Sequence, residues 1–193
     1  MTLRATNEDG MLRAAFRDAH GARLHGFALL VTLGDAPLAA SLSADALDAG
    51  ARDADELRHP ERAAAWLRGH VVRNLPRHSS RRDGRATDQA RSVLASLGVD
   101  EGTFDVLEQF SPVQRAALVA GDVEGLAPLD LELVLDAPSR SVQRRRADAR
   151  RRFLERRSAT THRIGSAGLE PAPGQLEQRI RSIADQALAR HSR

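Results

Sequence analysis

The stretch "VEGLAPLDLELVLDAPSRSVQRRRADARRRFLERR", from Val123 to Arg157, decides how this chain is interpreted. Its apolar residues are spaced for two helices, and the short break between them contains Asp136 and Pro138. The second helix is crowded with arginine: residues 140–157 carry nine arginines and two acids, whereas residues 99–136 carry nine acids and one arginine. This step in charge predicts that the second helix faces a polyanion, and the main alternative is a plain solvated helix face.

The composition favours a chain built from helices. Of the 193 residues, 41% are apolar but only 3% are aromatic, and many of the apolar residues are Ala and Leu. Packed helices use such residues, whereas strands draw on β-branched and aromatic ones. The chain has no cysteine, which excludes disulfides and thiolate metal sites within it. We therefore expect an all-α fold.

The sequence contains no segment that predicts a membrane association. No run of about 18 apolar residues occurs, so a transmembrane helix is not expected. The N-terminus carries charges at Arg4, Glu8 and Asp9, where a secretion signal has its apolar core. We expect a cytoplasmic protein.

Helical periodicity covers the first part of the chain. Residues 11–33 alternate apolar and polar side chains at helical spacing, with Gly21 as an interruption, and a further helix is expected over 38–48. A polar loop follows. Pro60 then opens a helix with an apolar stripe, which Pro76 is expected to break or kink.

The second part of the chain has stronger helix signals. Thr87 can cap a helix that ends at Gly98, and a short helix is expected over 100–109. In Ser111-Pro112-Val113-Gln114, Ser can cap, Pro suits the first helical position, and Gln can reach back as the partner in a capping box. This helix is expected to run to about Asp122.

These helices predict two small domains, over 8–78 and 89–157, joined by a basic linker over 79–88. The linker nearly lacks apolar residues, which is typical of a flexible connection. Residues 158–193 predict a turn-rich stretch and then a C-terminal helix over 175–190. The apolar stripe of that helix needs a partner, either the core of this chain or another protein.

Several short motifs stand in a consistent order along the chain. They are Phe27-Ala28-Leu29, Gly34-Asp35, Ala39 with Leu42, Trp66-Leu67 before Asn74, Gln114-Arg115, Asp122-Val123-Glu124-Gly125-Leu126, and Val142 before Arg144 and Arg145. Together these motifs resemble the second and fourth conserved regions of bacterial RNA polymerase sigma factors, in particular the extracytoplasmic-function class. The resemblance covers residues 11–82 and 100–157, and the alignment from 107 to 153 needs no gap.

The resemblance implies a partner for each domain. In such proteins the first domain docks on the clamp of core RNA polymerase and captures the opened −10 strand of promoter DNA, and the second domain reads the −35 element. It implies clamp contacts at Ser41, Leu42 and Asp45, −10 contacts at Asn74, Arg77, His78, Arg81 and Arg82, and −35 contacts at Arg140, Ser141, Gln143, Arg144 and Arg145. Many relatives are also held inactive by an anti-sigma factor, although no residue of this sequence identifies one.

The chemistry of the arginine-rich helix agrees with this assignment. Ser139 can cap the helix, and a helix N-terminus favours phosphate. Arginine can hold guanine through two parallel hydrogen bonds. Val142, Ala149 and Phe153 fall on one face, which is expected to be buried against the domain.

The first domain departs from the family pattern. Ala40, Ser41 and Ala44 stand where the clamp-binding helix usually has two acids and a Gln, and Asp45 alone keeps an acid. The loss of charge is expected to weaken docking. Residues 48–65 contain no aromatic side chain that could stack on a melted base, a contact typically worth about 1–3 kcal/mol.

The second domain also departs from the pattern. Glu132 replaces a small residue that lets the two helices pack closely, and Asp136 replaces the turn glycine. Aspartate tolerates left-handed backbone better than most residues but less well than glycine. Pro138 replaces the usual capping Ser, and Asp148 replaces a late arginine and would repel phosphate. Pro128 suits the first turn of its helix.

Two functions are compatible with these features. The first is a sigma factor-like protein that binds core RNA polymerase and directs it to promoter DNA. The second is a degenerate sigma-like regulator or adaptor that binds polymerase, another protein or DNA without initiating transcription. An enzyme is not expected, because the seven histidines lack metal-ligand spacing such as H-E-x-x-H, and the chain has no G-x-S-x-G motif and no phosphate loop. Accordingly, no cofactor, metal or small-molecule substrate is expected.

Overall fold

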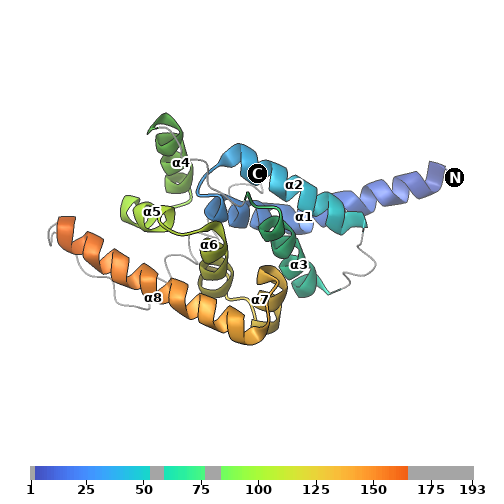
Figure 1. Ribbon diagram of the computed structural model, residues 1–193. Helices are drawn as coiled ribbons and strands as arrows, with labels where there is room; N and C mark the ends of the chain where they lie inside the picture. The colour runs from blue at the N-terminus through green and yellow to red at the C-terminus, as the bar shows by residue number, and fades with distance from the viewer. Residues whose placement is uncertain (1–2, 53–58, 77–83, 165–193) are drawn as a thin grey trace.

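The computed structural model describes residues 3–52, 59–76 and 84–164, and over these residues the chain is all-helical (Figure 1). Its first half consists of α1 (Leu3–Val31), α2 (Ala36–Arg52) and α3 (Pro60–Arg73). Its second half consists of α4 (Gly84–Ser96), α5 (Glu101–Glu108), α6 (Pro112–Leu118), the π-helical turn η1 (Val119–Val123), α7 (Pro128–Leu135) and α8 (Ser139–Ile164). The predicted all-α class is confirmed. None of the described helices is long and apolar enough to cross a membrane.

Local sequence signals determine where several helices begin. The predicted capping box of α6 is confirmed: the Ser111 hydroxyl accepts a hydrogen bond from the Gln114 N–H, and the Gln114 side chain accepts one from the Ser111 N–H. α5 begins after Asp100, whose carboxylate accepts a hydrogen bond from the Thr103 N–H at 3.0 Å. Pro128 is the first residue of α7, where its fixed φ and missing N–H are harmless.

Other predicted boundaries are wrong. α1 continues through Gly21 without a break, because a single helical glycine costs only about 1 kcal/mol and α1 packs along α2. α2 extends beyond the predicted 38–48 at both ends, and α4 begins before the predicted cap at Thr87. After Leu118 the backbone widens into η1, so the α-helix does not reach Asp122.

The turn between α1 and α2 lies directly against α4. Gly34 has a φ of +76°, and a Cβ atom at this position would lie 2.5 Å from the carbonyl oxygen of Ala90. A side chain at Gly34 would therefore clash with the backbone of α4, and only glycine adopts this φ without strain. This close approach joins the first helix of the second half to the first half.

Both halves of the chain contribute to one continuous hydrophobic core. α3 packs along α7, and α1 contacts α6 and η1 (Figure 1). The contact between α3 and α7 is close, since a Cβ atom on Gly69 would lie 2.6 Å from the carbonyl oxygen of Leu133. Phe27 and Leu67 of the first half belong to the same buried cluster as Leu131 of α7. The boundaries given above for two domains stay predictions, but the helices of both share this core.

Arg115 is the buried polar centre of this core. It is 4% exposed, and its guanidinium donates hydrogen bonds to the carbonyl oxygens of Val31 at 2.7 Å, Phe110 at 2.6 Å and Leu107 at 3.2 Å. These carbonyls lie at the end of α1 and around the end of α5, where the last carbonyl groups of a helix lack partners within it. A cation is also favoured there by the helix dipole. One side chain of α6 therefore caps helices from both halves.

A second buried arginine also joins the halves. Arg68 of α3 is 5% exposed and forms a bidentate ion pair with Glu124, with nitrogen–oxygen distances of 2.6 and 2.5 Å. The same guanidinium carbon lies 5.6 Å from the centre of the Phe27 ring, within the range of a cation–π contact. Arg68 therefore fixes α3 both to the segment after η1 and to α1.

We expect the substitution Arg115→Met to lower the free energy of unfolding by about 3 kcal/mol, because the buried carbonyl groups of Val31 and Phe110 lose this donor and that of Leu107 keeps only the N–H of Phe110. Unfolding in urea, followed by the fluorescence of the single tryptophan, Trp66, measures this change. The matched control is Arg152→Met, since Arg152 is exposed and has no ion pair within the described residues. We expect that control to change the free energy by less than about 0.5 kcal/mol. An equally small effect of Arg115→Met would show that this arginine does not hold the halves together.

Candidate nucleic-acid interface

The turn between α7 and α8 requires one residue with left-handed backbone. Asp136 supplies it, with φ of 45° and ψ of 55°, and its N–H donates to the carbonyl oxygen of Glu132. The N–H of Ala137 donates to the same oxygen at 3.3 Å, which closes α7. Aspartate thus takes the place of the turn glycine, as its tolerance of this backbone region predicts. Glu132 stands where a small residue would let the two helices pack closely, and it is half-buried. α7 and α8 are nevertheless in contact.

α8 begins earlier than a cap at Ser139 predicts. The carbonyl oxygen of Pro138 accepts hydrogen bonds from the N–H groups of Ser141 at 2.8 Å and Val142 at 3.1 Å. Ser139 is therefore already the first residue of the helix, and the predicted cap by Ser139 is wrong. Proline suits the position before the helix, because that residue needs no N–H for the first helical turn.

The inward face of α8 is apolar, and this prediction is confirmed. Val142, Ala149 and Phe153 are 0%, 1% and 4% exposed, and they pack into the common core. Their spacing of seven and four residues places them on one side of the helix. The opposite side of α8 is consequently turned to solvent.

Two aspartates anchor α8 to the rest of the second half. Asp122, in η1, pairs with Arg146 at 2.9 Å and with Arg150 at 3.5 Å. Asp100, the capping residue of α5, pairs with Arg157 at 3.0 Å. The helix is thus held near its middle and near its far end, and three of its arginines are drawn toward the protein.

The Asp100 anchor is stabilised in its charged form. Burial by itself would raise the pKa of this carboxyl, but hydrogen bonds from the hydroxyl and the N–H of Thr103, together with the charge of Arg157, outweigh it. The pKa of Asp100 therefore lies below its ordinary value. This ion pair persists as the pH falls through the mildly acidic range.

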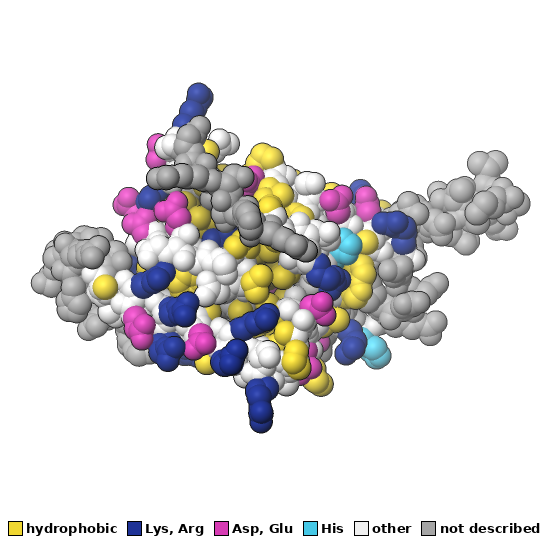
Figure 2. All heavy atoms as spheres, viewed as in Figure 1, with side chains coloured by type: hydrophobic (Ala, Val, Ile, Leu, Met, Phe, Trp, Pro, Cys, Tyr) yellow, Lys and Arg dark blue, Asp and Glu magenta, His cyan; other side chains and the backbone are white. Residues whose placement is uncertain are grey.

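The outward face of α8 begins with a cluster of exposed arginines. The chain has no lysine, and Figure 2 shows arginine side chains spread along this helix. Arg140, Arg144 and Arg145 are exposed, and none of the three has an ion pair within the part of the chain that the structure describes. Acids enter only further along, where Asp148 pairs with Arg151 at 3.0 Å. Three exposed arginines without ion pairs thus lie within the first two turns, and Arg152 further along is also exposed without one among the described residues.

The residues that the resemblance assigns to the −35 element all lie in these two turns. Arg140, Gln143, Arg144 and Arg145 are exposed, and Ser141 is half-buried. The residues that the resemblance selected thus lie on adjoining turns of one helix, on a surface that a partner can reach. Asp148 lies beyond it and is half-buried in its pair with the neighbouring arginine.

The residues assigned to the −10 strand are only partly described. Asn74 is exposed at the end of α3, where its side-chain amide donates to the carbonyl oxygen of His70 at 2.9 Å. That hydrogen bond closes the helix. The other four assigned residues lie outside the described residues: they are Arg77, His78, Arg81 and Arg82. The predicted C-terminal helix over 175–190 also lies outside them.

The three residues assigned to the polymerase clamp lie on α2 but do not share one environment. Ser41 and Asp45 are exposed, whereas Leu42 is 5% exposed and belongs to the core. In this structure Leu42 supports α2 from within and cannot touch a partner. Its burial follows from its helical spacing with the other core residues of α2.

Sequence reasoning missed a surface cluster next to α2. The rings of Trp66 and His70 lie with their centres 5.4 Å apart and their planes tilted by 32°. Burial and then the charge of Arg73 lower the pKa of His70, Asp45 raises it in part, and Arg52 lowers it again. Trp66, His70 and Arg73 are spaced for one face of α3, whereas Asp45 and Arg52 come from α2. Only the packing of the two helices brings the whole cluster together.

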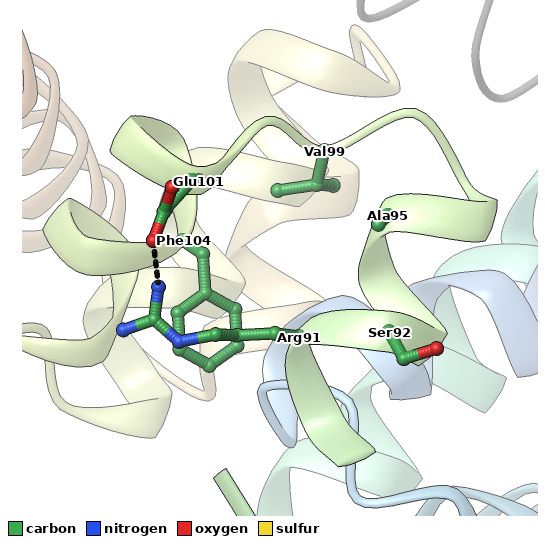
Figure 3. A pocket seen from close by; sticks show the side chains of 6 residues that line it. All are labelled: Arg91, Ser92, Ala95, Val99, Glu101 and Phe104. Atoms are coloured by element: carbon green, nitrogen blue, oxygen red, sulfur yellow. Dashed lines mark hydrogen bonds and ion pairs between the residues drawn. The ribbon is translucent and has the colours of Figure 1, made fainter. Parts of the chain in front are cut away.

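A shallow pocket between α4 and α5 does not form a ligand site (Figure 3). Its volume is about 190 Å³, below the roughly 300–1,000 Å³ of small-molecule sites. The guanidinium carbon of Arg91 lies 4.6 Å from the centre of the Phe104 ring, and the group pairs with Glu101 at 3.2 Å. Its polar groups are thus engaged in holding α4 to α5. Among the described residues there is also no cluster of His, Cys, Asp and Glu that could hold a metal ion.

Comparison with family models, with curated proteins and with solved structures found no match to this chain. The choice of a candidate site thus depends on physical features alone. The exposed arginines at the start of α8, which have no ion pairs among the described residues, are the strongest candidate. Asp122 and Asp100, which hold that helix in place, were not singled out by the sequence as anchors. The spacing of Asp100 and Thr103 is a recognisable cap signal, whereas no local signal pairs Asp122 with α8.

Proposed function

We propose that this protein binds duplex DNA through the first two turns of α8 and acts as a sigma factor-like subunit that directs core RNA polymerase to promoters. One observation carries the DNA-binding part: Arg140, Arg144 and Arg145 are exposed without ion pairs among the described residues, on a helix that follows a short turn after α7. The motif order from Phe27 to Arg145 carries the comparison with sigma factors.

Simple electrostatics supports DNA as the ligand of this surface. An arginine can hold the edge of guanine or a phosphate through two parallel hydrogen bonds. The N-terminal end of α8 adds the positive end of a helix dipole, which favours phosphate. The buried stripe through Val142 and Phe153 keeps the opposite face in the core. The first two turns of the helix can therefore enter a groove while their apolar residue, Val142, stays buried.

We call the arrangement with α3 packed on α7 the closed form. In this form the packing limits the distance between the −10-like and −35-like residues. Asn74 lies five residues after Gly69, and Arg140 lies seven residues after Leu133, to which Gly69 is apposed. From the helical rise and the length of an extended chain, the Cα atoms of Asn74 and Arg140 are within about 45 Å of each other. Two promoter elements about two turns of duplex apart are separated by roughly 70 Å.

This limit favours a second candidate function. A protein that keeps α3 on α7 can occupy one DNA site at a time, as an adaptor or regulator that does not initiate transcription. The buried arginines Arg68 and Arg115 favour the closed form. Charged groups at an interface are rehydrated when it separates, however, so opening is less unfavourable than separation of a purely apolar core. The sigma-like function requires this opening, and the adaptor function does not.

We expect Arg144→Gln to weaken binding to duplex DNA and to reduce the slope of log Kd against log salt concentration by about 1, because one phosphate contact is lost. Fluorescence anisotropy of a labelled duplex over a range of salt concentrations measures both quantities. Arg17→Gln is the matched control, since it removes the same charge from α1, which packs mainly on α2, α3, α6 and η1. An equal effect of both substitutions would indicate general attraction by net charge and would contradict a binding face on α8.

We expect run-off transcription with core RNA polymerase on a library of genomic fragments to yield specific transcripts, and Gly69→Ala to increase their amount. The added methyl group meets the backbone of Leu133 at 2.6 Å and forces α3 away from α7. Alanine also suits a helix better than glycine, so α3 itself remains stable. Gly26→Ala is the control, because a Cβ atom there meets nothing within 4 Å. DNA binding without transcripts from any of the three proteins would favour the adaptor.

A further inference from the structure

Asp122 occupies an unusual place in the chain, between α6 and the segment that leads to α7. The backbone there forms the π-helical turn η1 (Val119–Val123), and such turns are uncommon and often occur at functional sites. The side chain of Asp122 is only 12% exposed and faces α8. The widened turn thus brings a carboxylate from outside α8 against the middle of the arginine-rich helix.

The carboxylate of Asp122 engages two arginines of α8 through one oxygen. Its Oδ1 accepts hydrogen bonds from Nε of Arg146 at 3.2 Å and from Nη2 at 2.9 Å, and Nη1 of Arg150 lies 3.5 Å away. Gly121 makes room for this contact, because a Cβ atom there would lie 2.8 Å from Cδ and Nε of Arg146. A charged pair in such a half-buried setting is stronger than one in open solvent.

The second oxygen of this carboxylate is buried and has no hydrogen-bond partner within the described residues. An unsatisfied buried acceptor typically costs about 1–3 kcal/mol. The burial of Asp122 is therefore unfavourable for stability alone. Its clear effect is electrostatic: it holds the guanidinium groups of Arg146 and Arg150 against the protein.

The position of Arg146 on α8 makes this effect relevant to DNA. Arg146 follows Gln143 by three residues, or just under one helical turn, so the two are neighbours on the surface of the helix. Gln143 is exposed and belongs to the proposed DNA-binding face. The side chain of Arg146 is 30% exposed, and its hydrogen bonds go to Asp122. Without the carboxylate, Arg146 could extend along the same face to a phosphate.

We propose that Asp122 is a positioning residue of the DNA interface. By holding Arg146 and Arg150 on the flank of α8, it fixes the rotation of that helix and withholds two cations from the DNA backbone. Arg140, Arg144 and Arg145 at the start of the helix remain to contact DNA, and Arg152 lies beyond them. Because phosphate contacts add affinity without sequence information, this arrangement limits binding to arbitrary DNA. The inference rests on the proposed DNA-binding function.

The test measures binding to a labelled mixed-sequence duplex of about 20 base pairs as a function of salt concentration. We expect Asp122→Asn to steepen the slope of log Kd against log salt by about 1, and to raise the affinity at low salt several-fold, because Arg146 is released to a phosphate. The double variant Asp122→Asn, Arg146→Gln should return the slope to that of the wild-type protein. Asp148→Asn is the matched control, since it removes an acid of α8 whose partner is Arg151.

A second single variant tests the inference even if Asp122→Asn does not fold. Arg146→Gln in the wild-type background should leave the salt slope unchanged, whereas Arg144→Gln should lower it. An effect of Arg146→Gln as large as that of Arg144→Gln would overturn the inference, as would a folded Asp122→Asn variant with an unchanged slope or a slope matched by Asp148→Asn. In each of these cases the proposed function would stand. A wild-type protein without salt-dependent DNA binding would overturn the proposed function and the inference with it.

Discussion

Arg115 donates hydrogen bonds to carbonyl oxygens at the ends of α1 and α5, two helices that lie far apart in the sequence. Each of those helix ends would otherwise bury carbonyl groups without a partner, which is unfavourable. The cation satisfies them together and, from α6, draws the last turn of α1 into the core of the second half. The pairing of Arg68 with Glu124 and the close approach of Gly69 to Leu133 depend on the halves meeting in this way.

The same core determines how α8 is presented. Its apolar stripe is buried, Asp122 and Asp100 hold three of its arginines, and the arginines of its first two turns remain exposed. Net charge alone does not describe this surface, because only part of the basic helix is available to a ligand. The proposal that the protein binds DNA therefore rests on the unpaired arginines near Arg140, and less on the total of nine in the helix.

Local physics made part of this structure predictable from sequence. The capping box at Ser111, the proline at the start of α7 and the buried stripe of α8 depend on residues within a few turns of each other. The packing of α3 on α7 was not predictable, since it depends on Gly69, a helical glycine that sequence spacing does not distinguish from Gly26. For the same reason the −35-like residues, which are neighbours in the sequence, were selected as a group, whereas Asp122, which holds Arg146 and Arg150 from another segment, was missed.

The most direct test of the closed arrangement is a distance between the two halves in solution. The chain has no cysteine, so spin labels on Ser41→Cys and Ala147→Cys, both at exposed positions of α2 and α8, report only on that distance. For the free protein we expect a single narrow distance distribution in pulsed dipolar spectroscopy, because the halves share one core. A broad distribution that extends to long distances would show that the halves move independently, and it would contradict this account.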